Sequence, residues 1–274
     1  MNKFPLCPIF IPANKLDWVP KVVSSNADCI IFDLEDSVLP DQKESARNSL
    51  YSFLKANKPD ISILIRINPL DSETGKADLA LFAGNTKIFD ALMLPKIEEP
   101  SVLIGLPKVN VILLIETPLA VKNLPLLAES KQAVGIALGG ADLSASLGSD
   151  MSWDSLLYTR SKIVLEGSIN NLFTIDGPFM SISSLDELKQ ESMLSSKMGF
   201  NGKAAIHPSQ IDLANKVFSP PEAEVNKAKR ILEELDKAAK EGKGAAQLDG
   251  RMIDAASARM AENIVNINKL IQGK

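Results

Sequence analysis

The sequence predicts an α/β fold, a (β/α)8 TIM barrel with a C-terminal helical extension. Short runs rich in Ile, Val, Leu and Phe alternate with segments of helical pattern. Such runs are typical of strands buried on both faces of a parallel sheet. There are eight of them, the number that such a barrel needs, at residues 7–12, 29–34, 62–67, 91–96, 111–116, 134–139, 172–177 and 203–208.

Helical segments follow several of these runs. Residues 41–57 open with Asp41, which we expect to cap a helix, and Glu44 lies three positions later, at capping-box spacing. Residues 154–171 and 184–200 carry apolar residues at helical spacings. An open doubly wound sheet is the alternative fold. It usually has a glycine-rich first turn, and the first turn here, "IPANK", contains no glycine.

After Pro220 and Pro221 the short apolar runs end, and longer segments of helical pattern follow. We therefore predict two domains, a catalytic barrel over residues 1–220 and a helical extension over residues 221–274. Residues 222–244 have the pattern of a charged amphipathic helix, and a turn at Asp249–Gly250 precedes a second helix. In the plainest interpretation, the first of these helices is solvated and docks on the barrel.

Composition excludes several classes of partner. The net charge is −4, no Lys/Arg-rich run is present, and aromatic residues make up only 5% of the chain, so we expect no nucleic-acid partner. No apolar run reaches the roughly 18 residues of a membrane span, and the prolines near the N-terminus argue against a signal peptide. Cys7 and Cys29 lie in apolar stretches, as buried thiols do in a reducing cytosol. We therefore expect a cytoplasmic protein.

Polar residues end the predicted strands, where a barrel of this kind forms its active site. A cluster of carboxylates and cations at one rim is costly unless the groups bind a metal or one another. The residues concerned are Asp33, Glu35, Asp36, Arg66, Asn68, Lys96, Glu116, Thr117, Asp142, Asp176 and His207.

Glu116 and Asp142 are the candidate metal ligands, because each follows a very apolar run. Two carboxylates without a neighbouring His or Cys suit Mg²⁺, which prefers a few protein oxygens together with water and substrate oxygens. The alternative is that both are salt-bridged. His207 is the one histidine of the chain, which argues against a zinc site and against a Ser-His-Asp triad. We interpret His207 as structural, with an extended backbone before Pro208.

Arg66 is the candidate anion-binding residue at the mouth of the barrel. Its guanidinium could bind a substrate carboxylate or enolate oxygen, or could instead be a structural partner of Glu35 or Asp36. Lys96 ends another run and could form a Schiff base, so a lysine-dependent aldolase is an alternative mechanism.

Seven segments in series resemble one family. They are "ADCIIFDLEDSVLPDQKESAR", "IRINP", "LPKIE", "LLIET", "GGADLSASLG", "GFNGKAAIHPSQI" and "LDGRMID". Together they resemble the citrate lyase β-subunit-like (CitE-like) branch of the HpcH/HpaI aldolase superfamily. The resemblance implies a TIM barrel, often trimeric, with Mg²⁺ at the strand ends. It also implies carbon–carbon lyase or aldolase chemistry on short oxo or hydroxy acids, commonly as coenzyme A or carrier thioesters, through a metal-stabilised enolate.

The resemblance also implies roles for individual residues. It places Glu116 and Asp142 on Mg²⁺ and Arg66 on the substrate, and it makes Glu35 and Asp36 supports of the arginine and of the metal-bound waters. It places Asp254 over the active site of a neighbouring subunit, as the general acid/base. The alternative is that Asp254 is simply the N-cap of the last helix.

Two positions depart from the family pattern. Leu6 and Cys7 stand where relatives commonly have Arg-Ser, and Ala141 stands where they often have Glu. The missing arginine favours weighing a second hypothesis, an aldolase that acts on a free 2-oxo acid without coenzyme A. A third hypothesis is a subunit of a citrate lyase-type complex that is inactive alone.

Overall fold

The computed structural model describes residues 6–272 of the chain, which divides into two compact units, Met1–Phe218 and Ser219–Lys274. The first unit contains eight parallel strands, hydrogen-bonded in sequence order. They are β1 (Pro8–Pro12), β2 (Cys29–Asp33), β3 (Ser62–Arg66), β4 (Ala91–Leu94), β5 (Val111–Ile115), β6 (Ala133–Leu138), β7 (Phe173–Asp176) and β8 (Gly202–Lys203).

The sheet closes on itself through the residues around β8. The backbone N–H of Phe10 donates to the carbonyl of Ala205 at 2.9 Å, and the N–H of Ala205 donates to the carbonyl of Pro8 at 2.8 Å. Ile9 and Ala205 form a parallel bridge. The predicted (β/α)8 barrel is thereby confirmed.

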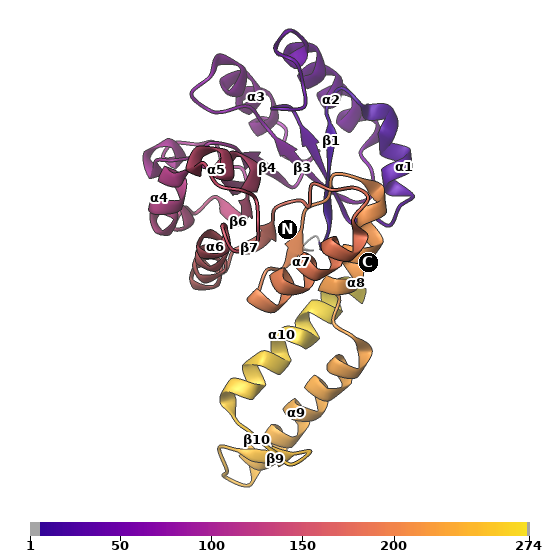
Figure 1. Ribbon diagram of the computed structural model, residues 1–274, viewed down its shortest axis with the longest axis vertical. Coiled ribbons are helices and arrows are strands. Elements are labelled where there is room, and N and C mark those ends of the chain that lie inside the picture. The colour runs from indigo at the N-terminus through magenta and orange to yellow at the C-terminus, as the bar shows by residue number, and fades with distance from the viewer. Residues whose placement is uncertain (1–5, 273–274) are drawn as a thin grey trace. The chain divides into compact units, whose positions relative to one another are not determined.

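Helices surround this barrel, as Figure 1 shows. Their bounds are α1 (Val19–Val23), α2 (Lys43–Asn57), α3 (Glu73–Ala83), α4 (Pro118–Ala128), α5 (Gly140–Leu147), α6 (Leu157–Asn170), α7 (Leu185–Met198) and α8 (Ile211–Phe218). Between β4 and β5 the connection contains only a 3-10 turn, Pro100–Leu103. Further 3-10 turns are Leu16–Trp18, Pro40–Gln42 and Pro208–Gln210.

The start of α2 differs from the sequence prediction. Asp41 was expected to cap this helix, but Pro40 begins a 3-10 turn that includes Asp41, and α2 starts only at Lys43. Gln42 occupies the cap position and makes no side-chain capping bond. The proline fixes its own backbone in a turn conformation, and this delays the helix by one residue.

Inward-facing side chains of alternate strand positions fill the barrel. They form one buried apolar cluster that contains Cys29, Ile31, Leu64, Ala91, Met93, Ile112, Leu114, Ala137, Phe173, Ile175 and Ala204. Because side chains alternate along a strand, the next inward position on β2, on β3 and after β5 lies at the C-terminal end of the barrel. Those positions are Asp33, Arg66 and Glu116.

The second unit is a helical hairpin with a small sheet. It consists of α9 (Glu222–Lys240), β9 (Ala246–Leu248), β10 (Arg251–Ile253) and α10 (Ala255–Gln272), and α9 packs on α10. The antiparallel strands are joined at Asp249 and Gly250, whose φ angles are +51° and +78°. Asp-Gly favours this tight turn, which the sequence predicted. None of the helices in residues 6–272 combines the length and apolar character that a membrane span requires.

Candidate active site

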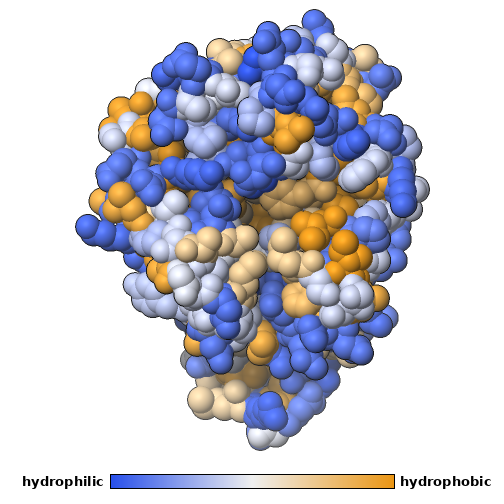
Figure 2. Space-filling model, turned by 45° about the horizontal axis from the view of Figure 1, so that its top comes forward, coloured by the Kyte–Doolittle hydropathy of each residue, from blue (hydrophilic) through white to orange (hydrophobic). Residues whose placement is uncertain are grey.

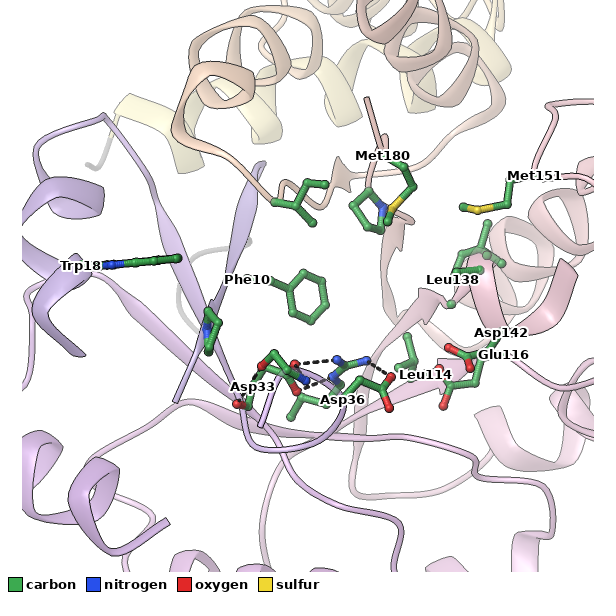
Figure 3. Close-up of a pocket in the computed structure, with 18 residues that line it drawn as sticks. Phe10, Trp18, Asp33, Asp36, Leu114, Glu116, Leu138, Asp142, Met151 and Met180 are labelled. Carbon is green, nitrogen blue, oxygen red and sulfur yellow. Dashed lines mark hydrogen bonds and ion pairs between the residues drawn. The ribbon is translucent and has the colours of Figure 1, made fainter. Parts of the chain in front are cut away.

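A pocket of about 460 Å³ opens at the C-terminal ends of the strands. This volume suits a small-molecule ligand. Apolar side chains form much of its wall, including those of Phe10, Trp18, Leu138, Met151 and Met180, which surround the opening in Figure 3. In Figure 2, hydrophobic side chains gather around a hollow near the centre of the face shown, whereas hydrophilic ones cover much of the surrounding surface.

Charged groups occupy one side of the pocket. Asp33, Asp36, Arg66, Glu116 and Asp142 all line it. Three of the five continue the inward alternation of the strand that carries them, so the pattern that fills the barrel also delivers these groups to its mouth. The structure therefore brings Arg66, Asp36 and the two candidate metal ligands together.

Arg66 is held by three carboxylates. Its Nε and Nη2 donate to Oδ1 and Oδ2 of Asp33, each at 2.7 Å. Its Nη1 lies 3.2 Å from Oε2 of Glu35 and 3.6 Å from Oδ2 of Asp36. The guanidinium carbon lies 5.2 Å from the centre of the Phe10 ring, within cation–π range.

Glu35 and Asp36 were expected as partners of Arg66, but Asp33, which makes the shortest contacts with it, was not. The alternation along β2 could have identified it, because Cys29, Ile31 and Asp33 share one face of the strand. Glu35 and Asp36 lie beyond the strand, in the turn that follows it.

The pKa values of two carboxylates around Arg66 shift in opposite directions. Burial alone would raise the pKa of Asp33, but its hydrogen bonds with Arg66 and the arginine's charge outweigh burial and lower that pKa. For Glu35, burial prevails and raises the pKa despite the nearby charge of Arg66. Neither oxygen of the Glu35 carboxylate accepts a hydrogen bond of regular geometry, although ion pairs surround it.

Glu116 is almost completely buried, with 1% of its surface exposed. Burial raises its pKa to about 8, and the negative charges of Glu35 and Asp142 add to the effect. Its Oε1 accepts a hydrogen bond of 2.7 Å from the backbone N–H of Lys96. A Cβ on Gly139 would lie only 2.7 Å from Oε2 of Glu116, so the glycine makes room for this carboxylate.

These residues fit a divalent cation. Figure 3 shows the carboxylates of Glu116 and Asp142 side by side. Burial raises the pKa of Glu116, and the negative charge of Asp142 adds to the effect; a divalent cation between the two carboxylates would relieve their repulsion. Among residues 6–272, no group of three or more His, Cys, Asp or Glu side chains is arranged to hold a metal. Two carboxylates with open positions suit Mg²⁺, which keeps several waters and substrate oxygens.

Lys96 lies beside the charged cluster. Its Nζ is 3.2 Å from Oε1 of Glu35, and its side chain is 43% exposed. Partial burial would lower the pKa of Lys96, but the charges of Glu35, Asp36 and Glu116 outweigh it and raise that pKa. A Schiff base requires a neutral amine, so this environment disfavours the lysine-dependent aldolase alternative.

Several other rim residues have different surroundings. Asp176 is fully buried and pairs with Arg160 and Lys203, each at 2.9 Å. His207 has the extended backbone expected before Pro208, and its Nδ1 lies 2.8 Å from the hydroxyl of Ser209. Neither Asp176 nor His207 lines the pocket.

Asp254 lies in the second unit, at the start of α10. Its Oδ1 accepts hydrogen bonds from the backbone N–H groups of Ala256 and Ser257, each at 3.0 Å. It therefore caps the helix, one of the two roles that the sequence left open. The pKa of Asp254 is lowered, mainly by the hydrogen bond from the backbone N–H of Ser257.

The chain is similar to characterised proteins along most of its length. The model of the family described as HpcH/HpaI aldolase/citrate lyase matches residues 7–208. A (3S)-malyl-CoA thioesterase of Cereibacter sphaeroides is 33% identical over 253 residues, which cover 90% of this chain and 88% of that protein. The citrate lyase subunit beta of Escherichia coli is 30% identical over 266 residues, covering 90% and 87% respectively.

A solved structure is similar over nearly the whole fold. It is the protein CitE from Mycobacterium tuberculosis in complex with magnesium, acetoacetate and coenzyme A. The two chains are 28% identical, with a TM-score of 0.82, and the match covers 98% of this chain and 100% of that one. These comparisons confirm the resemblance that the seven sequence segments indicated.

Proposed function

This chain belongs to the HpcH/HpaI aldolase/citrate lyase family, and we propose that it is a Mg²⁺-dependent carbon–carbon lyase. Its substrates are short hydroxy-acyl thioesters of the malyl-, citramalyl- or citryl-CoA type. One observation carries the proposal. Glu116, Asp142 and Arg66 meet in a single pocket at the strand ends, where two carboxylates can hold a cation beside a guanidinium that can bind an anion.

We assign the metal to Glu116 and Asp142. When bound there, Mg²⁺ supplies a Lewis acid that stabilises negative charge on the oxygens of the substrate. The buried Glu116 is fixed by the backbone N–H of Lys96, so it holds its position before the metal arrives. Asp142 comes from the first turn of α5.

Arg66 binds the substrate carboxylate or enolate oxygen in this proposal. Asp33 occupies Nε and Nη2, so Nη1 is the nitrogen best placed to act, and Glu35 and Asp36 support it from one side. The apolar wall of the pocket excludes water from the reacting carbons, which strengthens these electrostatic contacts.

We assign proton transfer to Asp254 of a neighbouring subunit. A base that is not a metal ligand keeps its basicity, and Asp254 belongs to the helical extension, residues 221–274, that we propose covers a neighbour's barrel. The assembly would then be a homotrimer or a larger homo-oligomer, located in the cytoplasm. The catalytic barrel would span residues 1–220.

The free-acid alternative is supported by the two residues that precede β1. Leu6 and Cys7 are buried, and their backbone N–H groups donate to Asp28, so this position supplies no cation for a coenzyme A phosphate. An aldolase that acts on a free 2-oxo acid therefore stays a second candidate. A subunit that works only within a citrate lyase-type complex is the third.

Product analysis of the purified protein with Mg²⁺ separates these candidates. Malyl-, citramalyl- and citryl-CoA are each supplied, in parallel with the corresponding free acids. A lyase yields an oxo acid and a shorter thioester. Simple hydrolysis, the reaction named in the thioesterase relative, yields free coenzyme A and an intact hydroxy acid instead. Turnover of free acids alone would favour the second candidate, and no turnover of any compound would favour the third.

Variants of the metal site complete the test. Glu116→Gln and Asp142→Asn should each abolish Mg²⁺ binding and activity while leaving the circular dichroism spectrum unchanged. Glu129→Gln is the matched control, because Glu129 is exposed at the end of α4, outside the pocket. Near-normal turnover of either site variant at low Mg²⁺ would place the metal elsewhere.

A further inference from the structure

A chain of buried polar groups lies behind the turn that carries Glu35. Lys43, the first residue of α2, donates from Nζ to the backbone carbonyl of Leu34 at 3.3 Å and to that of Glu35 at 3.0 Å. The same ammonium contacts Oδ1 of Asn68. Two consecutive carbonyls of the turn are thus bound by one side chain from the following helix.

Asn68 and Asp78 extend this chain. Asn68 Nδ2 donates to the carbonyl of Leu34 at 2.9 Å and to Oδ2 of Asp78 at 2.7 Å. The same Oδ2 accepts the backbone N–H of Asn68 at 3.0 Å. Asp78 is fully buried in α3, and its charge is balanced by Arg47 at 3.1 Å.

The contact between α3 and Asn68 depends on Gly75. A Cβ at this position would lie 2.0 Å from the carbonyl oxygen of Pro69 and 2.5 Å from that of Asn68. No side chain fits there, so the glycine allows α3 to approach the loop closely. Asp78, one turn further along α3, is thereby brought within hydrogen-bond reach of Asn68.

The charge of Lys43 is unfavourable for its own helix. It lies at the N-terminus of α2, where the helix dipole disfavours a cation. The compensation comes from the two carbonyls and from Asn68, all of which lie outside α2. The contacts of this lysine therefore stabilise the turn more than they stabilise the helix.

Glu35 is the residue that most needs a fixed backbone. It is 3% exposed, and neither carboxylate oxygen accepts a hydrogen bond of regular geometry. Its oxygens lie 3.2 Å from Arg66 and 3.2 Å from Lys96, so small shifts of its backbone would move its charge between the two cations. The carboxylate is held by these two ion pairs without a regular hydrogen bond, so its position depends on the backbone of the turn that carries it.

We propose that Lys43 is a positioning residue for Glu35, held in place by Asn68 and Asp78. It acts through the backbone carbonyls of Leu34 and Glu35, and through Glu35 on the substrate-binding Arg66. Lys43, Asn68 and Asp78 do not line the pocket, so their effect on the reaction is indirect. This inference rests on the proposed function, because Arg66 and Glu35 are its point of action.

A matched pair of lysine variants tests the proposal. Lys162, on α6, also donates to two consecutive carbonyls, those of Val121 at 2.6 Å and Lys122 at 3.2 Å, and it lies outside the pocket. Lys43→Met and Lys162→Met thus remove the same kind of contact from half-buried lysines. Both should lower the melting temperature by a similar amount. Only Lys43→Met should lower kcat/KM, by about tenfold or more, and Lys43→Arg should restore part of the loss.

A double-mutant cycle with Glu35→Gln separates positioning from general stability. If Lys43 acts through Glu35, the two variants act on one step, and the double variant should lose about as much kcat/KM as Glu35→Gln alone. Independent effects would multiply, to roughly a hundredfold loss where each single variant loses tenfold. Multiplying effects, or normal kcat/KM in Lys43→Met, would overturn the proposal.

A substitute variant and a binding control cover two other outcomes, a Lys43 variant that does not fold and a proposed function that is wrong. If Lys43→Met does not fold, Asp78→Asn takes its place in the cycle, because it weakens the anchor of Asn68 with a side chain of equal size. Pyruvate binding in the presence of Mg²⁺, followed by calorimetry, is measured first on the unmodified protein. Absence of binding there contradicts the proposed function, whereas normal binding together with unaffected Lys43 variants contradicts only the positioning role.

Discussion

Asp33 binds Arg66 through two parallel hydrogen bonds of 2.7 Å, one to each carboxylate oxygen. This fork-to-fork pairing fixes the plane of the guanidinium and uses two of its three nitrogens. Because both side chains are nearly buried, the arginine cannot turn away from the pocket without leaving Asp33 unpaired. Asp33 thus orients an anion-binding group, and its hydrogen bonds and charge outweigh burial and raise the pKa of Arg66.

We expect Arg66→Lys to lower kcat/KM by about tenfold or more, equivalent to about 1.4 kcal/mol. The lysine keeps the positive charge but cannot form the paired hydrogen bonds with Asp33 and reach the substrate as well. Steady-state kinetics with the preferred substrate measure the loss. An Arg66→Lys enzyme indistinguishable from the unmodified one would refute the substrate-binding role.

Asp33→Asn should be more destabilising than Arg66→Lys. It leaves a buried arginine without its main counter-charge, and breaking a buried pair in this way costs roughly 3 kcal/mol. Chemical denaturation of both variants, together with their kinetics, measures the effect. Asp36→Asn is the control, because Asp36 is 54% exposed and lies 3.6 Å from Arg66. Equal stabilities of Asp33→Asn and Asp36→Asn would mean that the fork contributes little.

Mg²⁺ affinity should rise with pH up to about 8, the pKa that burial gives Glu116. Below that pH the carboxyl of the metal-free protein is protonated, and a cation must displace the proton. We expect up to about a tenfold gain in affinity per pH unit, with proton release on binding. Calorimetry in buffers of different ionisation enthalpy detects both. Constant affinity between about pH 6 and pH 8 would show that Glu116 is already ionised.

The stability of the metal-free protein should fall as the pH rises, whereas its Mg²⁺ affinity rises. The folded-state pKa of Glu116 lies above its ordinary value of 4.5, so the native state holds the proton more tightly than the unfolded state. The contribution of this group to stability is therefore complete below about 4.5 and is lost as pH rises towards 8. Thermal unfolding with a chelator should show this loss, and Glu116→Gln should remove it.

His207→Gln should leave the pH–rate profile unchanged. The ring contacts Ser209 and does not line the pocket, so it has no direct route to the reacting atoms. Profiles of the two proteins between about pH 5 and pH 8 provide the comparison. A titration near pH 6.5 that disappears in the variant would contradict the structural role.

The strands were predictable because their chemistry is local. A run buried on both faces must be continuously apolar, and seven of the eight runs coincide closely with observed strands. The eighth run, residues 203–208, overlaps β8 only at Lys203. The Asp249–Gly250 turn is local in the same way, but the short strands β9 and β10 beside it lack a strong apolar pattern and were missed. The prediction of Asp41 as a helix cap was wrong because Pro40 sets the local backbone before the helix begins.

The site was predictable only in part. Arg66, Glu116 and Asp142 stand out because they are charged residues at or just beyond the ends of apolar runs, where a barrel of this kind forms its active site. Asp33 rather than Glu35 is the main partner of Arg66, and predicting this requires knowing which alternate positions of β2 face the barrel interior. The links from Lys43 to Asn68 and from Asn68 to Asp78 join residues on separate elements, 25 and 10 positions apart, so no helix or strand periodicity reveals them.

Asp254 offers the most informative prediction, because its capping role and its proposed chemical role can be separated. Asn caps helices as well as Asp does, so Asp254→Asn should keep α10 intact and remove only the titratable group. We expect the variant to unfold at the usual temperature and to have lost most of its kcat. Asp254→Ala, which removes the cap as well, is the control for helix stability. Full activity in Asp254→Asn would leave Asp254 with the capping role alone.

Mixing two inactive chains then tests whether Asp254 acts on a neighbouring subunit. An Asp254→Asn chain keeps its metal site, and a Glu116→Gln chain keeps its Asp254. If each extension serves a neighbour, some mixed oligomers pair an intact metal site with an intact Asp254. Random mixing in equal amounts should restore about one quarter of the unmodified activity per site. If subunit exchange is confirmed with labelled chains and no activity returns, Asp254 acts within its own subunit or takes no part in the reaction.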